Sequence, residues 1–333
     1  MIRGPTLRNA TLRQLKVFEC VARHASFTRA AAELHLTQPA VSLQVKDLES
    51  HVGIPLFEQL GRRIHLTTAG SEMLAHSRAI IARFRDADDA MQALRGHAGT
   101  LRVAVISAGD YFFPRVVARF LGAHPGATLD LAVVNRSELL ARLADNRVDL
   151  AIMTRPPPRS EGVSAPFSPH PHVIVARPDH PLATRKRIPL SRILQERFIV
   201  RERGSETRNV MPRAFGAALA KLDVAMEIGR TETIKQAVIA GLGISFLSAH
   251  TVALECQVGH LAVLDVQGFP LVLDWYVVHH RSKRLPPVAI AFRSYLLEYG
   301  AALVAEYTRF AAPPPNPRPG ARHGPRVNAK ESP

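Results

Sequence analysis

The sequence predicts a mixed α/β protein that begins with an all-α winged helix-turn-helix unit and continues through a long linker helix into a two-lobed α/β domain. Three observations carry this prediction. Short amphipathic helical runs and a strand-like pair fill residues 11–69, one unbroken helical run covers 70–96, and strands alternate with helices over 100–300. The Pro- and Arg-rich tail at 311–333 is expected to be disordered.

The N-terminal unit is predicted to hold three short helices. The first covers Leu12–His24, and two more follow within residues 26–52. Ser26 can cap the second helix. Thr37 can cap the third, with Pro39 in its first turn, where a missing N–H costs nothing.

The third of these helices has two different faces. Apolar residues at i, i+4, i+7 and i+11 define a buried side: Val41, Val45, Leu48 and Val52. The opposite side suits a DNA major groove, where Gln pairs with adenine and Lys reaches guanine or phosphate. The predicted DNA contacts are Ser26, Thr28, Arg29, Thr37, Gln38, Pro39, Ser42, Leu43 and Lys46. An ordinary helix pair in an all-α core would show the same period, and this alternative stays open.

Two short strand-like pieces follow, around a Gly-Arg-Arg tip at 61–63. This is the pattern of a hairpin wing whose basic tip can lie along phosphate or in the minor groove. We therefore add Arg62 and Arg63 to the predicted DNA contacts. A solvated turn is the alternative.

A long helix is predicted from the cap at 67–70 to about Leu94. Apolar residues along it alternate steps of three and four after Ser77, in the manner of a heptad seam. The predicted dimerisation residues are Ile80, Phe84, Ala87, Met91 and Leu94. Because no helical partner follows directly in the sequence, we expect a second copy of the chain to cover this stripe. A place in an intramolecular core is the alternative.

From residue 100 onward, the alternation of strands and helices predicts a parallel sheet with crossover helices. We expect lobe I over about 100–160 and 270–300, and lobe II over about 161–269, as in a periplasmic binding protein. Hydroxyl and basic groups at strand ends and helix starts favour a small anion between the lobes. The predicted effector-binding residues are Ser107, Asn135, Ser137, Thr154, Arg155, Arg201, Ser205, Thr207, Arg208, Thr231 and Thr233. Helix caps without a ligand are the alternative.

Composition narrows the class of partner. The chain has 333 residues, and 43 Lys and Arg against 28 Asp and Glu give a formal net charge of +15, which favours a polyanion. No run reaches the roughly 18 apolar residues of a membrane helix, and no secretory signal is apparent, so we expect a cytoplasmic protein without a membrane partner. The two cysteines lie far apart and are expected to be reduced thiols.

The sequence gives little support for a catalytic site or a metal site. The close histidine pairs at 170/172 and 279/280 have no Cys or carboxylate at ligand spacing, so no metal is expected. No Ser/His/Asp or paired-carboxylate set is identifiable, so no catalytic residue and no enzymatic activity are expected. The Gly-x-Gly at 241–243 lies after a helix and before a strand, the reverse of a dinucleotide loop, so no cofactor is expected either.

The motifs together resemble the LysR-type transcriptional regulators over residues 11 to about 300. The most specific matches are Ser26-Phe27-Thr28-x-Ala30-Ala31, Thr37-Gln38-Pro39-Ala40-Val41-Ser42 and Leu66-Thr67-x-Ala69-Gly70. The resemblance implies a ligand-responsive regulator that binds double-stranded promoter DNA. Gln59 stands where the family usually has Arg, which implies that one phosphate contact is missing.

Within the family, the chain is similar to regulators of Calvin-cycle (RuBisCO, carbon dioxide fixation) operons. Three of the motifs that carry this are Asp110-Tyr111-Phe112, Ile152-Met153-x-Arg155-Pro156-Pro157 and Ile234-Lys235-Gln236-Ala237-Val238. The resemblance implies a homodimer or homotetramer, a phosphorylated or nucleotide metabolite as effector, and RNA polymerase as a further candidate partner. Glu206 replaces a usual Gly, which implies an altered phosphate preference.

Two alternatives remain open. One is a LysR-type regulator of another metabolic operon. The other is a solute-binding module or enzyme built on the same lobes, against which the N-terminal helix-turn-helix and the missing signal peptide argue.

Overall fold

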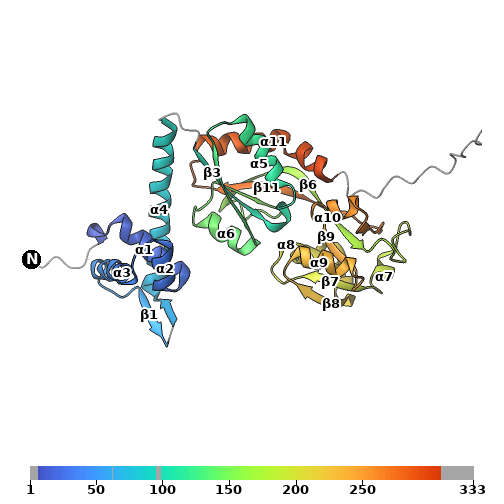
Figure 1. The fold of residues 1–333 in the computed structure, drawn as a ribbon, viewed down its shortest axis with the longest axis horizontal. Helices are drawn as coiled ribbons and strands as arrows, with labels where there is room; N and C mark the ends of the chain where they lie inside the picture. Colours follow the sequence, from blue (N-terminus) through green and yellow to red (C-terminus); the bar gives the residue numbers. More distant parts are fainter. Residues whose placement is uncertain (1–6, 62, 95–98, 309–333) are drawn as a thin grey trace, which may run out of the picture.

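The computed structural model of the chain describes residues 7–61, 63–94 and 99–308, without the side chains of residues 89, 90, 92–94, 307 and 308. Figure 1 shows three parts in chain order, namely a small helical unit, one long helix and a two-lobed α/β domain. The fold class predicted from the sequence is confirmed. The predicted tail at 311–333 lies outside the described residues.

The N-terminal unit is a three-helix bundle closed by a hairpin. After a 3₁₀ turn at Leu7–Asn9, its elements are α1 (Leu12–His24), α2 (Phe27–Glu33), α3 (Gln38–Val52), β1 (Phe57–Leu60) and β2 (Arg63–Leu66). Side chains set the helix starts, because Thr11, Ser26 and Thr37 each accept a hydrogen bond from a backbone N–H in the first turn. Phe18 and Val21 lie fully buried where the three helices meet.

The long helix α4 (Thr68–Leu94) is anchored in this unit at its start. Gly70 permits a close approach, because a Cβ there would lie 2.0 Å from the backbone oxygen of Leu56. Met73 and Ser77 are buried. The predicted apolar stripe therefore does not begin at Ser77, which faces the inside of the same chain.

Lobe I is a sheet covered by helices. Its elements are β3 (Thr100–Ile106), α5 (Phe113–Ala123), β4 (Thr128–Val134), α6 (Arg136–Ala144), β5 (Leu150–Met153), β11 (Leu271–His280) and α11 (Pro287–Thr308), with a 3₁₀ turn at Ser107–Gly109. Strand β3 pairs in parallel with β4 and β5, as the alternating pattern predicts. Strand β11 returns from lobe II and pairs antiparallel with β5. The sheet is therefore mixed, and the prediction of a parallel sheet is confirmed for β3, β4 and β5 but wrong for β11.

Lobe II is the inserted half of the domain. Its elements are β6 (Gly162–Ala176), α7 (Leu190–Ile193), β7 (Arg197–Arg201), α8 (Glu206–Phe215), η3 (Gly216–Lys221), β8 (Asp223–Ile228), α9 (Thr231–Ile239), β9 (Ser245–Ser248), α10 (Ala249–Gln257) and β10 (Ala262–Val263). Strands β7 and β8 form a parallel pair, while β9 and β10 pair antiparallel with β6. Apolar side chains such as Phe198, Phe215 and Phe246 fill its core.

Two long antiparallel strands, β6 and β11, connect the lobes (Figure 1). Trp275 is fully buried at this crossing, and the ring of His170 stacks on it with centroids 4.3 Å apart. The strand-like run at residues 173–176 forms only the last part of β6, and the prolines at 166, 169 and 171 lie within the strand. The strand begins at Gly162 instead and accommodates its prolines beside a register shift at Trp275/Tyr276.

Two helix ends and one whole helix differ from what the local sequence pattern predicts. The helix after Ser205 ends at Phe215 and continues as the 3₁₀ segment 216–221. Helix α10 was not predicted, because residues 249–257 mix polar and apolar types without a clear period. Helix α11 reaches Thr308, beyond the predicted end near Tyr299.

Residues 287–306 of α11 are the one described helical segment long and apolar enough to cross a membrane by length and composition. Val288, Phe292 and Leu296 of this segment are buried in the core of lobe I. The packing of α11 against lobe I accounts for its apolar composition.

Candidate functional sites

The polar face of α3 is turned to solvent, opposite a closed apolar face. Val41, Val45 and Leu48 are at most 2% exposed. The predicted contacts on the other side are all exposed, namely Thr37, Gln38, Pro39, Ser42, Leu43 and Lys46. In α2, Thr28 and Arg29 are exposed, while Ser26 is half-buried because it caps the helix. The structure thus brings the predicted DNA contacts of α2 and α3 to accessible positions.

The hairpin wing is held against α3 by one carboxylate. Glu49 Oε1 accepts hydrogen bonds from the backbone N–H groups of Leu56 (2.7 Å) and Phe57 (3.2 Å). At the tip, Gly61 has a φ of +64°, and the amide of Gln59 donates to its carbonyl oxygen at 3.0 Å. Gln59 therefore bonds to the tip itself.

Only one of the two predicted wing arginines lies within the described residues. Arg63 is exposed at the start of β2. Arg62 lies outside the described residues. The described part of the wing thus offers one cation beside α3.

Large apolar side chains stand exposed along α4. The exposed fractions are 46% for Ile80, 61% for Phe84 and 53% for Met91, and Ala87 is exposed as well. The side chain of Leu94 lies outside the described residues. An exposed row of this kind on a helix needs a partner surface.

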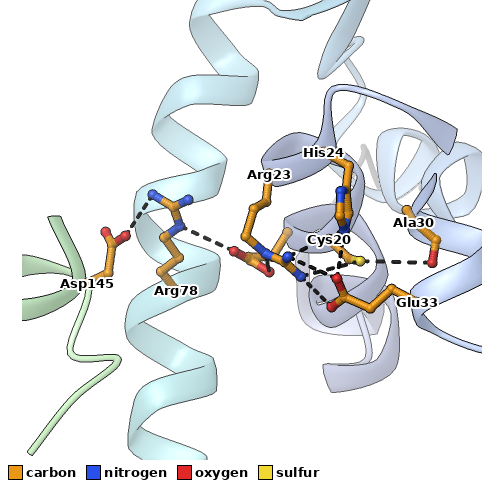
Figure 2. Close-up of polar contacts among 8 residues, drawn as sticks. Cys20, Arg23, His24, Ala30, Glu33, Arg78 and Asp145 are labelled. Atoms are coloured by element: carbon orange, nitrogen blue, oxygen red, sulfur yellow. Dashed lines mark hydrogen bonds and ion pairs between the residues drawn. The ribbon is translucent and has the colours of Figure 1, made fainter. Parts of the chain in front are cut away.

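A chain of ion pairs joins lobe I to the N-terminal unit through α4 (Figure 2). Arg78 Nη1 lies 2.9 Å from Asp145 Oδ2, at the end of α6, and Arg78 Nε lies 3.6 Å from Glu19 in α1. Glu19 in turn lies 3.6 Å from Arg23, whose guanidinium donates to both carboxylate oxygens of Glu33 in α2. Lobe I and the helices of the N-terminal unit are therefore electrostatically linked through α4.

A second contact holds α4 against lobe I. Lys283 Nζ donates to Asn146 Oδ1 at 2.8 Å and lies 3.0 Å from Asp149 and 3.6 Å from Asp86 of α4. The Lys283 side chain is almost fully buried. Two separate points of contact make it possible for a shift of lobe I to move α4.

Three potential metal ligands gather in the N-terminal unit. Ligand atoms of Cys20, His24 and Glu33 lie within 4.8 Å of one another. The carboxylate of Glu33 is already paired with Arg23, which holds its pKa down to about 2. Burial, followed by the nearby Glu33, raises the pKa of the Cys20 thiol to about 11. The group is thus an ion-pair cluster with a protonated thiol (Figure 2).

The lobe I residues of the predicted effector site fall into two groups. Thr154 is buried and Arg155 half-exposed at the end of β5, and Ser107 is half-buried at the end of β3. Asn135 caps α6 by accepting from the N–H of Glu138, and Ser137 is exposed in the same turn. Of these residues, Thr154 and Arg155 contact lobe II, as described below.

The lobe II residues are largely bonded within their own lobe. Ser205 caps α8, where its side chain accepts from the backbone N–H of Arg208. Arg201 is buried and donates to the hydroxyl of Thr231 at 2.9 Å and to the neighbouring Glu202. Three further predicted residues complete the set, namely Thr207, which is buried, Arg208, which is half-buried, and Thr233, which is exposed.

Sequence reasoning missed the cationic partner that completes the contact between the lobes. Glu206 accepts from Thr154 and Arg155, and it also faces Arg136 at the start of α6. An arginine in the first turn of a helix carries no distinctive pattern. Its position beside Asn135, at the end of a strand, was the available signal.

A second polar contact across the lobes also went unpredicted. The hydroxyl of Tyr111 in lobe I donates to Glu232 in α9, and the buried Lys235 lies 4.7 Å from the centre of the Tyr111 ring. Lys235 pairs with Glu232 and with Glu255, each at 2.7 Å. Burial, followed by this hydrogen bond, raises the pKa of Tyr111, so the phenol is the donor.

The crossing between the lobes holds three buried histidines, His170, His172 and His250. Burial lowers the pKa of His172 to about 4 and that of His250 to about 3, so both rings are neutral near pH 7. His170 Nε2 and Ser248 Oγ lie 2.7 Å apart. These rings pack against Trp275 and Phe246.

Two protein families match the chain, one over its N-terminal unit and one over its α/β domain. Residues 12–71 match the family described as "Bacterial regulatory helix-turn-helix protein, lysR family". Residues 94–301 match the family described as "LysR substrate binding domain". The two matches together cover most of the chain.

Curated relatives and a solved structure agree with these matches. The regulator CfxR of Cupriavidus necator is 48% identical over 89% of this chain and 93% of its own length. The RuBisCO operon transcriptional regulator of Allochromatium vinosum is 46% identical over 89% of this chain and 98% of its own. The regulatory domain of CcmR from Synechocystis PCC6803, solved in complex with 2-PG, is 38% identical, with a TM-score of 0.57 over 60% of this chain and 96% of that one.

Proposed function

Because the chain belongs to the LysR family of bacterial regulatory helix-turn-helix proteins, we propose that it controls carbon dioxide fixation genes in response to a small anionic metabolite. In this proposal the protein acts in the cytoplasm as a DNA-binding regulator and not as an enzyme. The printed names of the relatives, which include RuBisCO operon transcriptional regulators at 46% and 45% identity, support the choice of target genes.

The observation that carries the proposal is the face of α3. Its Gln38, Ser42 and Lys46 are exposed, while the opposite side is closed by fully packed valine and leucine side chains. Within the part of the chain that the structure describes, these polar side chains are not used in packing, and they match the donors and acceptors of a major groove. Arg63 on the wing is exposed and can contact a DNA phosphate. The formal net charge of +15 also favours DNA as the partner.

The protein binds DNA as a dimer, and the exposed apolar stripe on α4 holds the two chains together. Ile80, Phe84 and Met91 would be covered by the same residues of a second copy, which places two α3 helices on two half-sites. Two such pairs would form the homotetramer that the family resemblance implies.

The effector binds between the lobes as an anion. The support for this is chemical, since Arg136, Thr154 and Arg155 direct donors to one point at the lobe contact. The complex of the similar CcmR domain with 2-PG supports a small anionic ligand.

DNA binding is tested by fluorescence anisotropy with the full chain, using a promoter fragment and random DNA across a salt series. Affinity should fall linearly on a log–log plot with rising salt, because released counterions drive binding. Lys46→Ala should reduce the slope by about one unit. Gln38→Ala should cost roughly 1–3 kcal/mol of discrimination between the two DNAs, the value of a good bidentate contact, and Ser42→Ala should also reduce the discrimination.

The matched control is Ser50→Ala, because the Ser50 hydroxyl bonds to the carbonyl of Lys46 near the far end of α3. This variant should keep both the slope and the discrimination. Full discrimination by Ser42→Ala, or equal binding of promoter and random DNA by the wild type, would show that this face does not read bases.

A further inference from the structure

Glu206 carries a carboxylate of lobe II into contact with lobe I. One carboxylate oxygen accepts hydrogen bonds from Thr154 Oγ1 (2.8 Å) and Arg155 Nε (2.6 Å). The other lies 3.4 Å from Arg155 Nη2 and 3.5 Å from Arg136 Nη1. The Glu206 side chain is only 7% exposed. All three partners belong to lobe I, so this contact closes the space between the lobes.

The charges at this contact do not balance. Two guanidinium groups, those of Arg136 and Arg155, face the single carboxylate of Glu206. Burial lowers the pKa of Arg136 and the charge of Arg155 adds to this, while Glu206 raises the pKa again. The site therefore has room for more negative charge than one carboxylate supplies. A phosphate, which carries about −1.5 to −2 near pH 7, would match two arginines more closely.

A cavity of about 250 Å³ opens beside the contact. Thr154 and Arg155 line it together with Asn209, Arg213 and Tyr276. A ligand anion in this cavity would meet the same hydroxyl and guanidinium donors that Glu206 now occupies. Glu206 and such a ligand therefore compete for one set of donors.

We propose that Glu206 is a built-in counter-anion, which closes the cleft without ligand and is displaced when an effector bearing a phosphate binds. This inference rests on the proposed effector cleft and deepens it. Glu206 then determines specificity, because an anion with a higher charge gains more from Arg136 and Arg155 than the carboxylate it replaces. Weakly charged anions should fail to displace it.

The test is calorimetric titration of the full chain with 2-PG and, separately, with inorganic phosphate. Glu206→Ala should bind both probes roughly tenfold more tightly than the wild type, because no internal anion has to leave. Glu206→Gln, which keeps the size of the side chain, should also bind them more tightly. The matched control is Glu196→Ala, since Glu196 pairs with Arg192 and His180 of its own lobe, and this variant should change affinity less than twofold.

Hydrogen exchange gives a readout that needs no ligand. In ligand-free Glu206→Ala, amides in the first turn of α8 and after β5 should exchange faster than in the wild type, because the lobes separate more often. Glu196→Ala should leave the amides after β5 unchanged. Added phosphate should slow exchange after β5 in Glu206→Ala more than in the wild type.

The outcomes separate this inference from the proposed function. Equal or weaker anion binding by both Glu206 variants overturns the competition, and unchanged exchange overturns the closing contact. Failure of every variant to bind either probe overturns displacement by an anion. If the variants behave as expected but neither probe changes DNA binding, the inference stands and the proposed regulatory role of the cleft is refuted.

Discussion

Phe84→Glu should separate the paired form of the protein into single chains. The Phe84 side chain is 61% exposed in the single chain, halfway along α4. A phenylalanine offers about 200 Å², so pairing would bury about 120 Å² in each copy. At about 25 cal/mol per Å², this is about 3 kcal/mol per copy, or about 6 kcal/mol for two. The dissociation constant should therefore rise by about 10⁴-fold, before the cost of burying two carboxylates.

The assay is sedimentation equilibrium of the full chain over a range of concentrations. Ser71→Glu is the matched control, because it adds the same charge to an exposed position on another face of α4. The control should sediment like the wild type, while Phe84→Glu should sediment as a monomer at micromolar concentration. Unchanged sedimentation of Phe84→Glu would refute the reasoning and assign the stripe to another role.

Two further predictions concern the crossing between the lobes and the α4 junction. The folded-state pKa values of His172 and His250 lie below the usual 6.5. Their contribution to the free energy of unfolding is therefore fully present above about pH 6.5 and is lost as the pH drops toward 4. The loss should be about 1 kcal/mol per histidine between pH 6.5 and 5.5, seen in urea unfolding followed by the fluorescence of Trp275, the single tryptophan; a constant midpoint would contradict it. Arg78→Ala removes the partly buried pair to lobe I and should speed hydrogen exchange at the end of α6 about 5- to 30-fold, whereas Arg119→Ala, from a half-exposed pair, should have little effect. Equal exchange in both variants would show that the junction does not hold lobe I.

Local sequence signals predicted the N-terminal unit closely. Thr37 as a cap and Gly53 as a left-handed helix end fix α3 at Gln38–Val52, and both act through neighbouring residues only. The exposed face of α3 follows directly from helical period. At β6, by contrast, the local pattern is strand-like only over residues 173–176, while the pairing with β11 sustains the strand from Gly162 onward.

Contacts between distant residues limited the prediction of the effector site. Thr154 and Arg155 were predicted from their place after a strand, and they do meet lobe II. Glu206 in the first turn of a helix looks like an ordinary favourable acid at the helix N-terminus. That its carboxylate reaches Arg136 depends on how the lobes pack, and no local pattern encodes this. The bonds of the Arg201 guanidinium to Glu202 and Thr231 are likewise not indicated by any local pattern, and its role in effector binding stays a prediction.

The most direct test of the account is footprinting of the purified chain on the region upstream of a RuBisCO operon from its own genome, with and without 2-PG. The account predicts protection of two half-sites facing the same side of the duplex, with a changed boundary or affinity when 2-PG is added. It also predicts that Gln38→Ala weakens this protection more than it weakens binding to random DNA. Absence of any protected site at low salt would contradict the account.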